Sequence, residues 1–184
     1  MDKIKLRLQG LSEIVGIEDI SLLSLVDEGE ERQLVVTCDQ AMRKEIQMRM
    51  MDKREMTFRC PEVMAKLMNA RGYQQFEVLI SGQVDGEYFT EVWDMMNDHH
   101  FQIRCSDGIL FALANNCPIY ATRRLMLQQS VPYQAGSTKV ALPVNVITDE
   151  MLEQSLQKAI ELENYEMASN LRDELKKRHA HEGE

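Results

Sequence analysis

HHFQIRCSDGILFALANNCPIYATRRLM, residues 99–126, is the stretch that decides the fold. Residues 101–103 alternate between apolar and polar, as in a strand with one buried face. Ser106 and Asp107 predict the start of a helix, because serine is a good N-cap and an acidic residue suits the positive end of the helix dipole. Apolar residues at helical spacing follow as far as Asn115-Asn116, where the helix is predicted to end before a short strand. The stretch therefore predicts a complete strand–helix–strand unit.

Two hairpins are predicted upstream of this unit. Residues 20–37 contain two apolar segments on either side of Asp27–Glu30, which reads as a turn. Residues 75–95 contain a second pair around Asp85-Gly86, a strong two-residue hairpin signal. Both hairpins predict antiparallel pairing of neighbouring strands.

Glu91 is an unusual residue within the second hairpin. If Asp85-Gly86 form the turn, Ile80 lies opposite Glu91, and the carboxylate shares a face with apolar side chains. A carboxylate in such a place needs a partner or a function. An ion pair with an arginine such as Arg104 is the structural alternative, and both interpretations stay open.

The remaining elements complete the fold prediction. Residues 4–8 alternate as a first strand that ends near Gly10. Residues 40–50 carry apolar side chains at four-residue intervals, which is typical of an amphipathic helix on a core. Pro61 and Gly72 suit the start and the end of another helix. The pattern predicts an α+β fold with a mostly antiparallel sheet and helices packed on one side.

The C-terminal part predicts a separate antiparallel helical hairpin over residues 148–179. Thr148 is the expected cap of its first helix, and Glu163-Asn164 is the expected break between the two helices. Two helices this short bury little between them, so a protein partner or a second copy is expected to pack against them. The predicted contact residues are Leu152, Leu156, Ile160, Tyr165, Leu171 and Leu175.

Length and composition set the domain organisation. The 184 residues allow one domain over residues 1–133, a linker over 134–147, the hairpin over 148–179 and a frayed tail over 180–184. The formal net charge of −9 argues against tight non-specific binding of nucleic acid, which calls for positive charge. The four cysteines have no CxxC spacing, so reduced thiols are expected rather than a zinc site or disulfides. No apolar run is long enough to cross a membrane and none reads as a signal peptide, which predicts a cytoplasmic protein.

The central stretch resembles the core signature of the bifunctional nuclease family, which reads Arg-Pro-Ser-Asp-Ala-Ile, a short helix, then Ala-Pro-Ile-Tyr or Phe. The matching residues are Arg104, Ser106, Asp107, Ile109, Pro118, Ile119 and Tyr120. The C-terminal run LEQSLQKAIELENYEMASNLRDELKKR resembles the UVR motif of excision-nuclease subunits and Clp-protease adaptors. In those families the motif is a protein-docking and self-pairing element, so the resemblance implies a protein partner or a homo-oligomer.

The first resemblance implies hydrolysis of DNA or RNA phosphodiesters, a reaction in which carboxylates usually hold a divalent metal. It implies Asp107, Glu91 and Ser106 as catalytic residues, with Asp107 and Glu91 also holding Mg²⁺ or Mn²⁺. The residues expected to contact substrate are Arg104, Arg123 and Arg124, although a solvated surface is the plain alternative for the last two.

Departures from the family pattern support a second hypothesis. The usual glutamate after the third strand is Gln40, the usual Thr-His-Asp is Cys60-Pro61-Glu62, and the aspartate two positions before the signature arginine is Gln102. Each change removes a group that could bind metal or move a proton. Helix capping alone could also explain Ser106 and Asp107. The sequence thus leaves open a metal-dependent nuclease with Asp107 at its centre and a non-catalytic module that recruits a partner through the hairpin.

Overall fold

The computed structural model describes residues 2–14, 17–51, 54–84, 86–135, 149–161, 163–165, 168–169, 171–173 and 175–176. The strands are β1 (Lys3–Ile14), β2 (Ile17–Asp27), β3 (Arg32–Asp39), β4 (Phe76–Val84), β5 (Glu87–Asp94), β6 (His99–Ile103), β7 (Ile119–Thr122) and β8 (Val131–Pro132). The helices are α1 (Gln40–Met51), the short 3-10 helix η1 (Arg54–Phe58), α2 (Cys60–Ala70), α3 (Cys105–Asn115), α4 (Arg123–Gln129) and α5 (Asp149–Glu161). The predicted α+β class is confirmed.

The strands of the described residues form one sheet in the order β6-β5-β4-β7-β1-β2-β3-β8. The pair β4–β7 is parallel, and every other neighbouring pair is antiparallel. β7 therefore joins two antiparallel three-stranded units, β1–β2–β3 and β4–β5–β6. The predicted antiparallel character and both predicted hairpins are confirmed.

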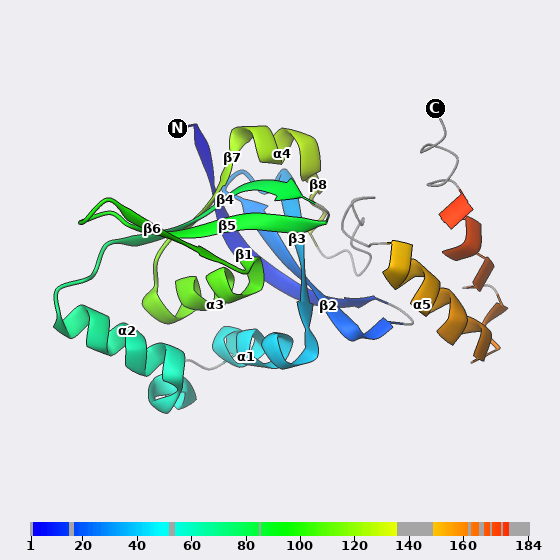
Figure 1. Ribbon diagram of the computed structural model, residues 1–184, viewed down its shortest axis with the longest axis horizontal. Coiled ribbons are helices and arrows are strands. Elements are labelled where there is room, and N and C mark those ends of the chain that lie inside the picture. Colours follow the sequence, from blue (N-terminus) through cyan, green and yellow to red (C-terminus); the bar gives the residue numbers. More distant parts are fainter. Residues whose placement is uncertain are drawn as a thin grey trace.

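The sheet curls strongly. The hydroxyl of Tyr88 on β5 donates a hydrogen bond to the backbone carbonyl of Val35 on β3 at 3.1 Å, although four strands separate β5 from β3 in the sheet. Helices α1, α3 and α4 contribute Ile46, Ile109 and Leu125 to one buried core. Figure 1 shows α1 and α3 on one side of the sheet and α4 on the other. The prediction that the helices pack on one side is thus wrong for α4. Because the sheet is curled, helices on both of its sides can reach the same core.

A bulge changes the predicted register of the β4–β5 hairpin. The pairing shifts between Ile80 and Gly82, so Ile80 lies opposite Thr90 and Leu79 lies opposite Glu91. Because side chains alternate along a strand, this shift moves Glu91 to the face opposite the one predicted. The expected position of Glu91 among the apolar side chains of that face is therefore wrong. A glycine inside a strand is a known sign of a bulge, so Gly82 carried the missing signal.

The first strand is longer than predicted. β1 continues beyond Gly10 to Ile14, because β2 pairs with it along this whole length. A second bulge lies between Leu8 and Gly10, where the pairing register also shifts. The alternation of residues 4–8 therefore predicted the strand correctly, but the position where β1 ends depends on its pairing with β2.

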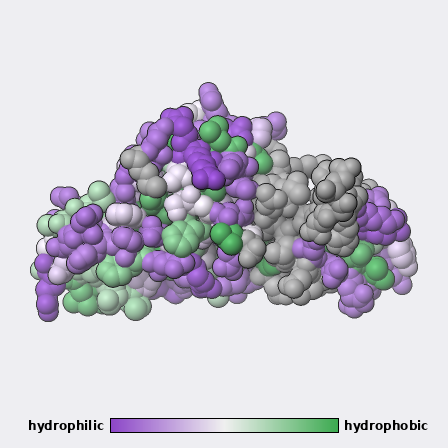
Figure 2. Space-filling model, turned by 45° about the horizontal axis from the view of Figure 1, so that its top comes forward, coloured by the Kyte–Doolittle hydropathy of each residue, from purple (hydrophilic) through white to green (hydrophobic). Residues whose placement is uncertain are grey.

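Helix α2 turns its apolar side outward. None of the residues Cys60–Ala70 is buried, and Val63, Met64 and Leu67 are 40%, 50% and 55% exposed. Figure 2 shows apolar surface at the left-hand end of the molecule, the end where Figure 1 places α2. Apolar packing therefore does not explain how α2 is attached.

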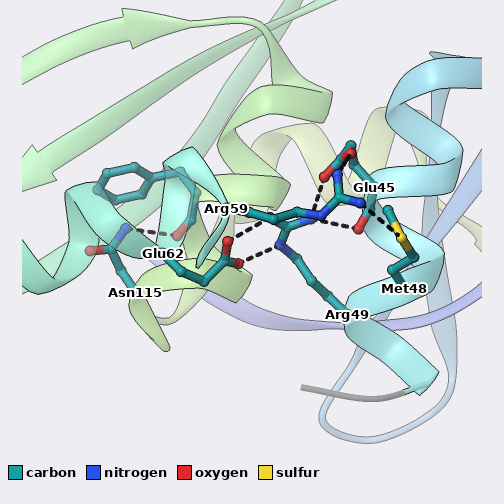
Figure 3. Close-up of polar contacts among 7 residues, drawn as sticks. Glu45, Met48, Arg49, Arg59, Glu62 and Asn115 are labelled. Atoms are coloured by element: carbon teal, nitrogen blue, oxygen red, sulfur yellow. Dashed lines mark hydrogen bonds and ion pairs between the residues drawn. The ribbon is translucent and has the colours of Figure 1, made fainter. Parts of the chain in front are cut away.

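Ion pairs attach α2 to α1. The buried Arg49 of α1 donates from Nε and from a second guanidinium nitrogen to the two carboxylate oxygens of Glu62, at 2.7 and 2.8 Å. Arg49 also pairs with Glu45 at 2.8 Å, and Glu45 pairs with Arg59 at the start of α2 (Figure 3). Burial disfavours the charge of Arg49, yet the hydrogen bonds and charges of Glu62 and Glu45 together raise its pKa. The network gives α2 a polar attachment and leaves its apolar side uncovered by described residues.

The C-terminal residues begin with α5. Leu152 and Leu175 form a small buried cluster, and Leu156 and Leu171 pack against it. The other two predicted contact residues, Ile160 and Tyr165, are 48% and 70% exposed. Most of the predicted linker and the whole frayed tail lie outside the described residues. Within those residues, no helix is long and apolar enough to span a membrane.

Candidate functional site

Helix α3 begins one residue earlier than Ser106, the predicted N-cap. Its N-cap is Arg104, with extended backbone angles φ −61° and ψ 143°, and in the described structure no side chain caps this end. Cys105 is buried in the core, which explains why the chain already turns into the helix at this point. Helix capping therefore does not account for Ser106, which lies at the second helical position.

The start of α3 opens into a pocket of about 300 Å³, which we call the seam pocket. It lies where the curl of the sheet brings β3 close to β5. Its lining includes Asp39 from β3, Glu87 and Tyr88 from β5, and Arg104, Cys105 and Ser106 from the start of α3.

Ser106 is a polar residue of the pocket wall with no polar partner among the described residues. Only 9% of it is exposed, and it lines the seam pocket. Within the ranges that the structure describes, its hydroxyl makes no hydrogen bond. The hydroxyl oxygen is not among the fully buried polar atoms, so it is available to a molecule that enters the pocket.

Arg104 is the cation of the site. Its Nε donates to the Oδ2 of Asp107 at 2.5 Å, one turn into the helix. This hydrogen bond is the main reason why the pKa of Arg104 is raised, and the negative charges of Asp39 and Glu87 act in the same direction. Asp39 is itself held in place, because its Oδ1 accepts a hydrogen bond from the backbone of Met42 at 2.8 Å.

The cysteines near the pocket are poor nucleophiles. Burial raises the pKa of Cys38 to about 11 and that of Cys105 to about 12. Both side chains therefore remain thiols near neutral pH, whereas cysteine attacks as the thiolate. The chemistry of the pocket rests on its arginine, its hydroxyl and its carboxylates.

The structure places the predicted catalytic residue Glu91 away from the seam pocket. α3 packs on the sheet face of Thr90, since a Cβ atom added at Gly108 would lie 3.2 Å from the Thr90 side chain. Glu91 is the next residue of the strand and lies on the other face. There its Oε1 is 3.7 Å from the Nε2 of His100. The suggested alternative, a pair between Glu91 and Arg104, is also wrong, because Arg104 pairs with Asp107.

A metal held jointly by Asp107 and Glu91 does not fit this arrangement, since the two carboxylates lie on opposite faces of the sheet. Asp107 is also already paired with Arg104. In the part of the chain that the structure describes, no group of three His, Cys, Asp or Glu side chains is placed to hold a metal. We therefore derive no chemical step through a metal at these residues.

Arg123 and Arg124 lie at the start of α4, on the other side of the sheet from α3 (Figure 1). Both are exposed, and Arg123 pairs with Asp2. The structure thus brings together Arg104, Ser106 and Asp107 but not the other three predicted site residues. Sequence reasoning missed Asp39 and Glu87, which stand beside a strand end and a hairpin turn where only the curl of the sheet makes them neighbours.

The sequence of the chain is similar to a known protein family. Residues 23–134 match the bifunctional nuclease domain, and the matched range covers well over half of the chain. It contains the whole of α3 and every residue that lines the seam pocket except Ile20. The chain belongs to the bifunctional nuclease domain family. No curated protein matches the chain.

Proposed function

We propose that this protein is a nuclease that hydrolyses phosphodiester bonds of DNA or RNA at the seam pocket. The observation that carries the proposal is the uncapped start of α3. The first bond within this helix runs from Gly108 N to Arg104 O at 2.8 Å, so the backbone N–H groups of residues 105–107 have no partner inside it. A helix start of this kind binds phosphate through its N–H groups and its dipole.

Each pocket residue has a role in this proposal. Arg104 and the N–H groups of α3 bind the phosphate oxygens and stabilise the negative charge that grows on them during attack. Ser106 adds one hydroxyl donor from the pocket wall. Asp107 is a positioning residue that holds the guanidinium of Arg104 toward the helix start. Asp39 or Glu87 can accept a proton from the attacking water.

The test compares two arginines that each stand where a strand meets a helix. Purified wild type is incubated with labelled single-stranded DNA and RNA, with Mg²⁺ or Mn²⁺ and with chelator. Arg104→Gln is expected to lower the cleavage rate about 100-fold or more, the typical loss for a donor to transition-state charge. Arg123→Gln serves as the matched control and is expected to cleave like wild type, because Arg123 lies outside the pocket and pairs with Asp2.

Two outcomes would contradict the proposal. Equal cleavage by wild type and Arg104→Gln would mean a contaminant or a different site. No cleavage by wild type under any metal condition would favour the second function, a docking module that keeps the fold of the family. Chelator sensitivity together with loss in Arg104→Gln would show that a divalent metal joins the reaction through ligands other than the Asp107–Glu91 pair.

A separate observation supports the docking function. The four leucines of the predicted contact set pack on one another, while Ile160 and Tyr165 remain exposed beside Glu161 and Glu163. We propose that residues 148–179 form a UVR-like hairpin and that Ile160 and Tyr165 contact a protein partner or a second copy of the chain. Ile160→Asp and Tyr165→Asp are expected to abolish self-association in light scattering without unfolding the hairpin. Leu156→Asp is expected to disrupt the hairpin itself, and self-association that survives all three variants would exclude this surface.

A further inference from the structure

A stacked pair of rings lies at the open edge of the sheet. Trp93 of β5 and His100 of β6 stack with ring centroids 4.6 Å apart and planes inclined by 22°. β6 is the last strand at its end of the sheet, and the His100 side chain is 52% exposed. Half of this outer ring therefore remains accessible to a flat molecule.

The pair carries two further polar features. In the described structure the indole Nε1 of Trp93 is buried and has no hydrogen-bond partner. The Oε1 of Glu91 lies 3.7 Å from the Nε2 of His100, and at this distance the carboxylate can orient the imidazole.

The two ends of the sheet differ. The end at β8 has only two residues and includes Pro132, features that block further strand pairing. The end at β6 has five residues, HHFQI, without lysine, proline or an acidic residue. Residues 99–102 of β6 are all exposed. This edge thus presents aromatic rings where sheets usually place protective charges.

The stack is connected to the seam pocket by β6 itself. The strand runs from His100 through Ile103 directly into Arg104 at the start of α3. At the rise of an extended strand, these four steps span about 13 Å. Because β6 is the edge strand, a short single strand that passes around this edge can place one phosphate at the start of α3 on one face of the sheet and an unpaired base against the stack on the other face.

We propose that the Trp93–His100 stack is a base-stacking subsite that selects single-stranded nucleic acid. The proposal rests on the nuclease function proposed above and names its substrate class. Aromatic side chains stack on bases of any sequence, but only where the bases are free from a duplex. With a net charge of −9 the chain cannot rely on general attraction to phosphate, so stacking supplies binding that charge does not.

The experiment uses Trp93, the single tryptophan of the chain, as its reporter. The full-length protein with chelator is titrated with a single-stranded thymidine decamer and with a DNA hairpin duplex of equal length. Saturable change of tryptophan fluorescence by the single strand alone is the expected result. Equal change by duplex and single strand, or no change with either, would overturn the subsite.

Variants on β6 sharpen the test. His100→Ala is expected to weaken decamer binding about tenfold or more, the usual effect of losing a base–aromatic contact, and His100→Phe is expected to restore it. Phe58→Ala is the matched control, because Phe58 is 91% exposed and lies in η1, outside the sheet that holds the stack. Equal binding by His100→Ala and wild type would overturn the proposal.

Cleavage assays separate this inference from the nuclease function. Binding that depends on His100 without any cleavage would support the subsite and contradict the proposed reaction. Cleavage that depends on Arg104, with a KM unchanged in His100→Ala, would support the reaction and contradict the subsite.

Discussion

Helices α3 and α4 start with the same backbone geometry, but only α4 has a side-chain cap in the described structure. Each follows a short strand directly, and the two N-cap residues have nearly identical backbone angles, −61° and 143° at Arg104 and −64° and 145° at Thr122. The Thr122 hydroxyl accepts a hydrogen bond from the backbone N–H of Leu125 at 3.3 Å, which satisfies the start of α4. Arg104 instead turns its side chain to Asp107. Two equal backbone geometries therefore give one closed helix start and one that is open to an anion.

The substitution with the largest expected effect gives the start of α3 the threonine cap that α4 has. Arg104→Thr is expected to lower nuclease activity about 100-fold or more, because it removes the guanidinium and lets a hydroxyl occupy the first N–H groups. The same change is expected to stabilise the fold by about 0.5 to 1 kcal/mol, the usual value of a cap. Activity assays and chemical denaturation measure the two effects. Arg104→Gln is the control, since it should lose activity without the gain in stability.

A second variant tests the positioning of the arginine. Asp107→Asn keeps the shape of the side chain but removes the charge that holds Arg104, so activity is expected to fall about tenfold, less than when Arg104 itself is lost. The fold should lose at most about 1 kcal/mol. Glu91→Gln, on the other face of the sheet, is expected to leave kcat unchanged. A larger loss in Glu91→Gln than in Asp107→Asn would contradict the site assigned here.

The closed helix start gives the opposite expectation. Thr122→Ala removes the cap of α4 and also the hydrogen bond from the Thr122 hydroxyl to the backbone of Ser81. A loss of about 1 to 2 kcal/mol is expected, seen as a thermal midpoint lower by about 2 to 4 °C per kcal/mol. Activity per folded molecule should not change. Reduced activity at full folding would show that α4 takes part in the site.

The smallest expected effect belongs to Ser106→Ala. The hydroxyl has no partner in the described protein, so its removal should leave the free energy of unfolding nearly unchanged. Activity is expected to fall by roughly threefold to tenfold, the value of one ordinary hydrogen bond. Inorganic phosphate should raise the thermal midpoint of wild type more than that of Ser106→Ala. Equal protection of both would remove Ser106 from the pocket's ligand contacts.

Local signals predicted much of the fold. The turn at Asp27–Glu30 and the β4–β5 hairpin were predicted correctly, because turn residues act over a few neighbouring positions. The β4–β5 register was correct next to the turn, where Val84 lies opposite Glu87, and wrong from Ile80 on, because a bulge beside Gly82 shifts every pair farther from the turn. The start of α3 was misplaced, because the burial of Cys105 in the core outweighs the capping preference of Ser106.

The site was only half predictable for a related reason. Arg104, Ser106 and Asp107 are close in sequence, and a helix start keeps them close in space. Asp39 and Glu87 join them only through the curl that lets Tyr88 reach Val35. That curl depends on the whole sheet, and no local pattern reports it. The outward apolar side of α2 was hidden for the same reason, since it follows from the pairing of Arg49 with Glu62 across two helices.

The central place of β7 has a consequence for synthesis on the ribosome. β7 is one of the last strands to be made, yet it lies between β4 and β1. Until Ile119–Thr122 leave the exit tunnel, the nascent chain holds two unjoined three-stranded units, each with an unpaired edge. At roughly 5 to 20 residues per second, the edge of β1 waits on the order of ten seconds for its partner. Such edges attract other chains, so the yield of folded protein is expected to depend on chaperones that shield the N-terminal unit during translation.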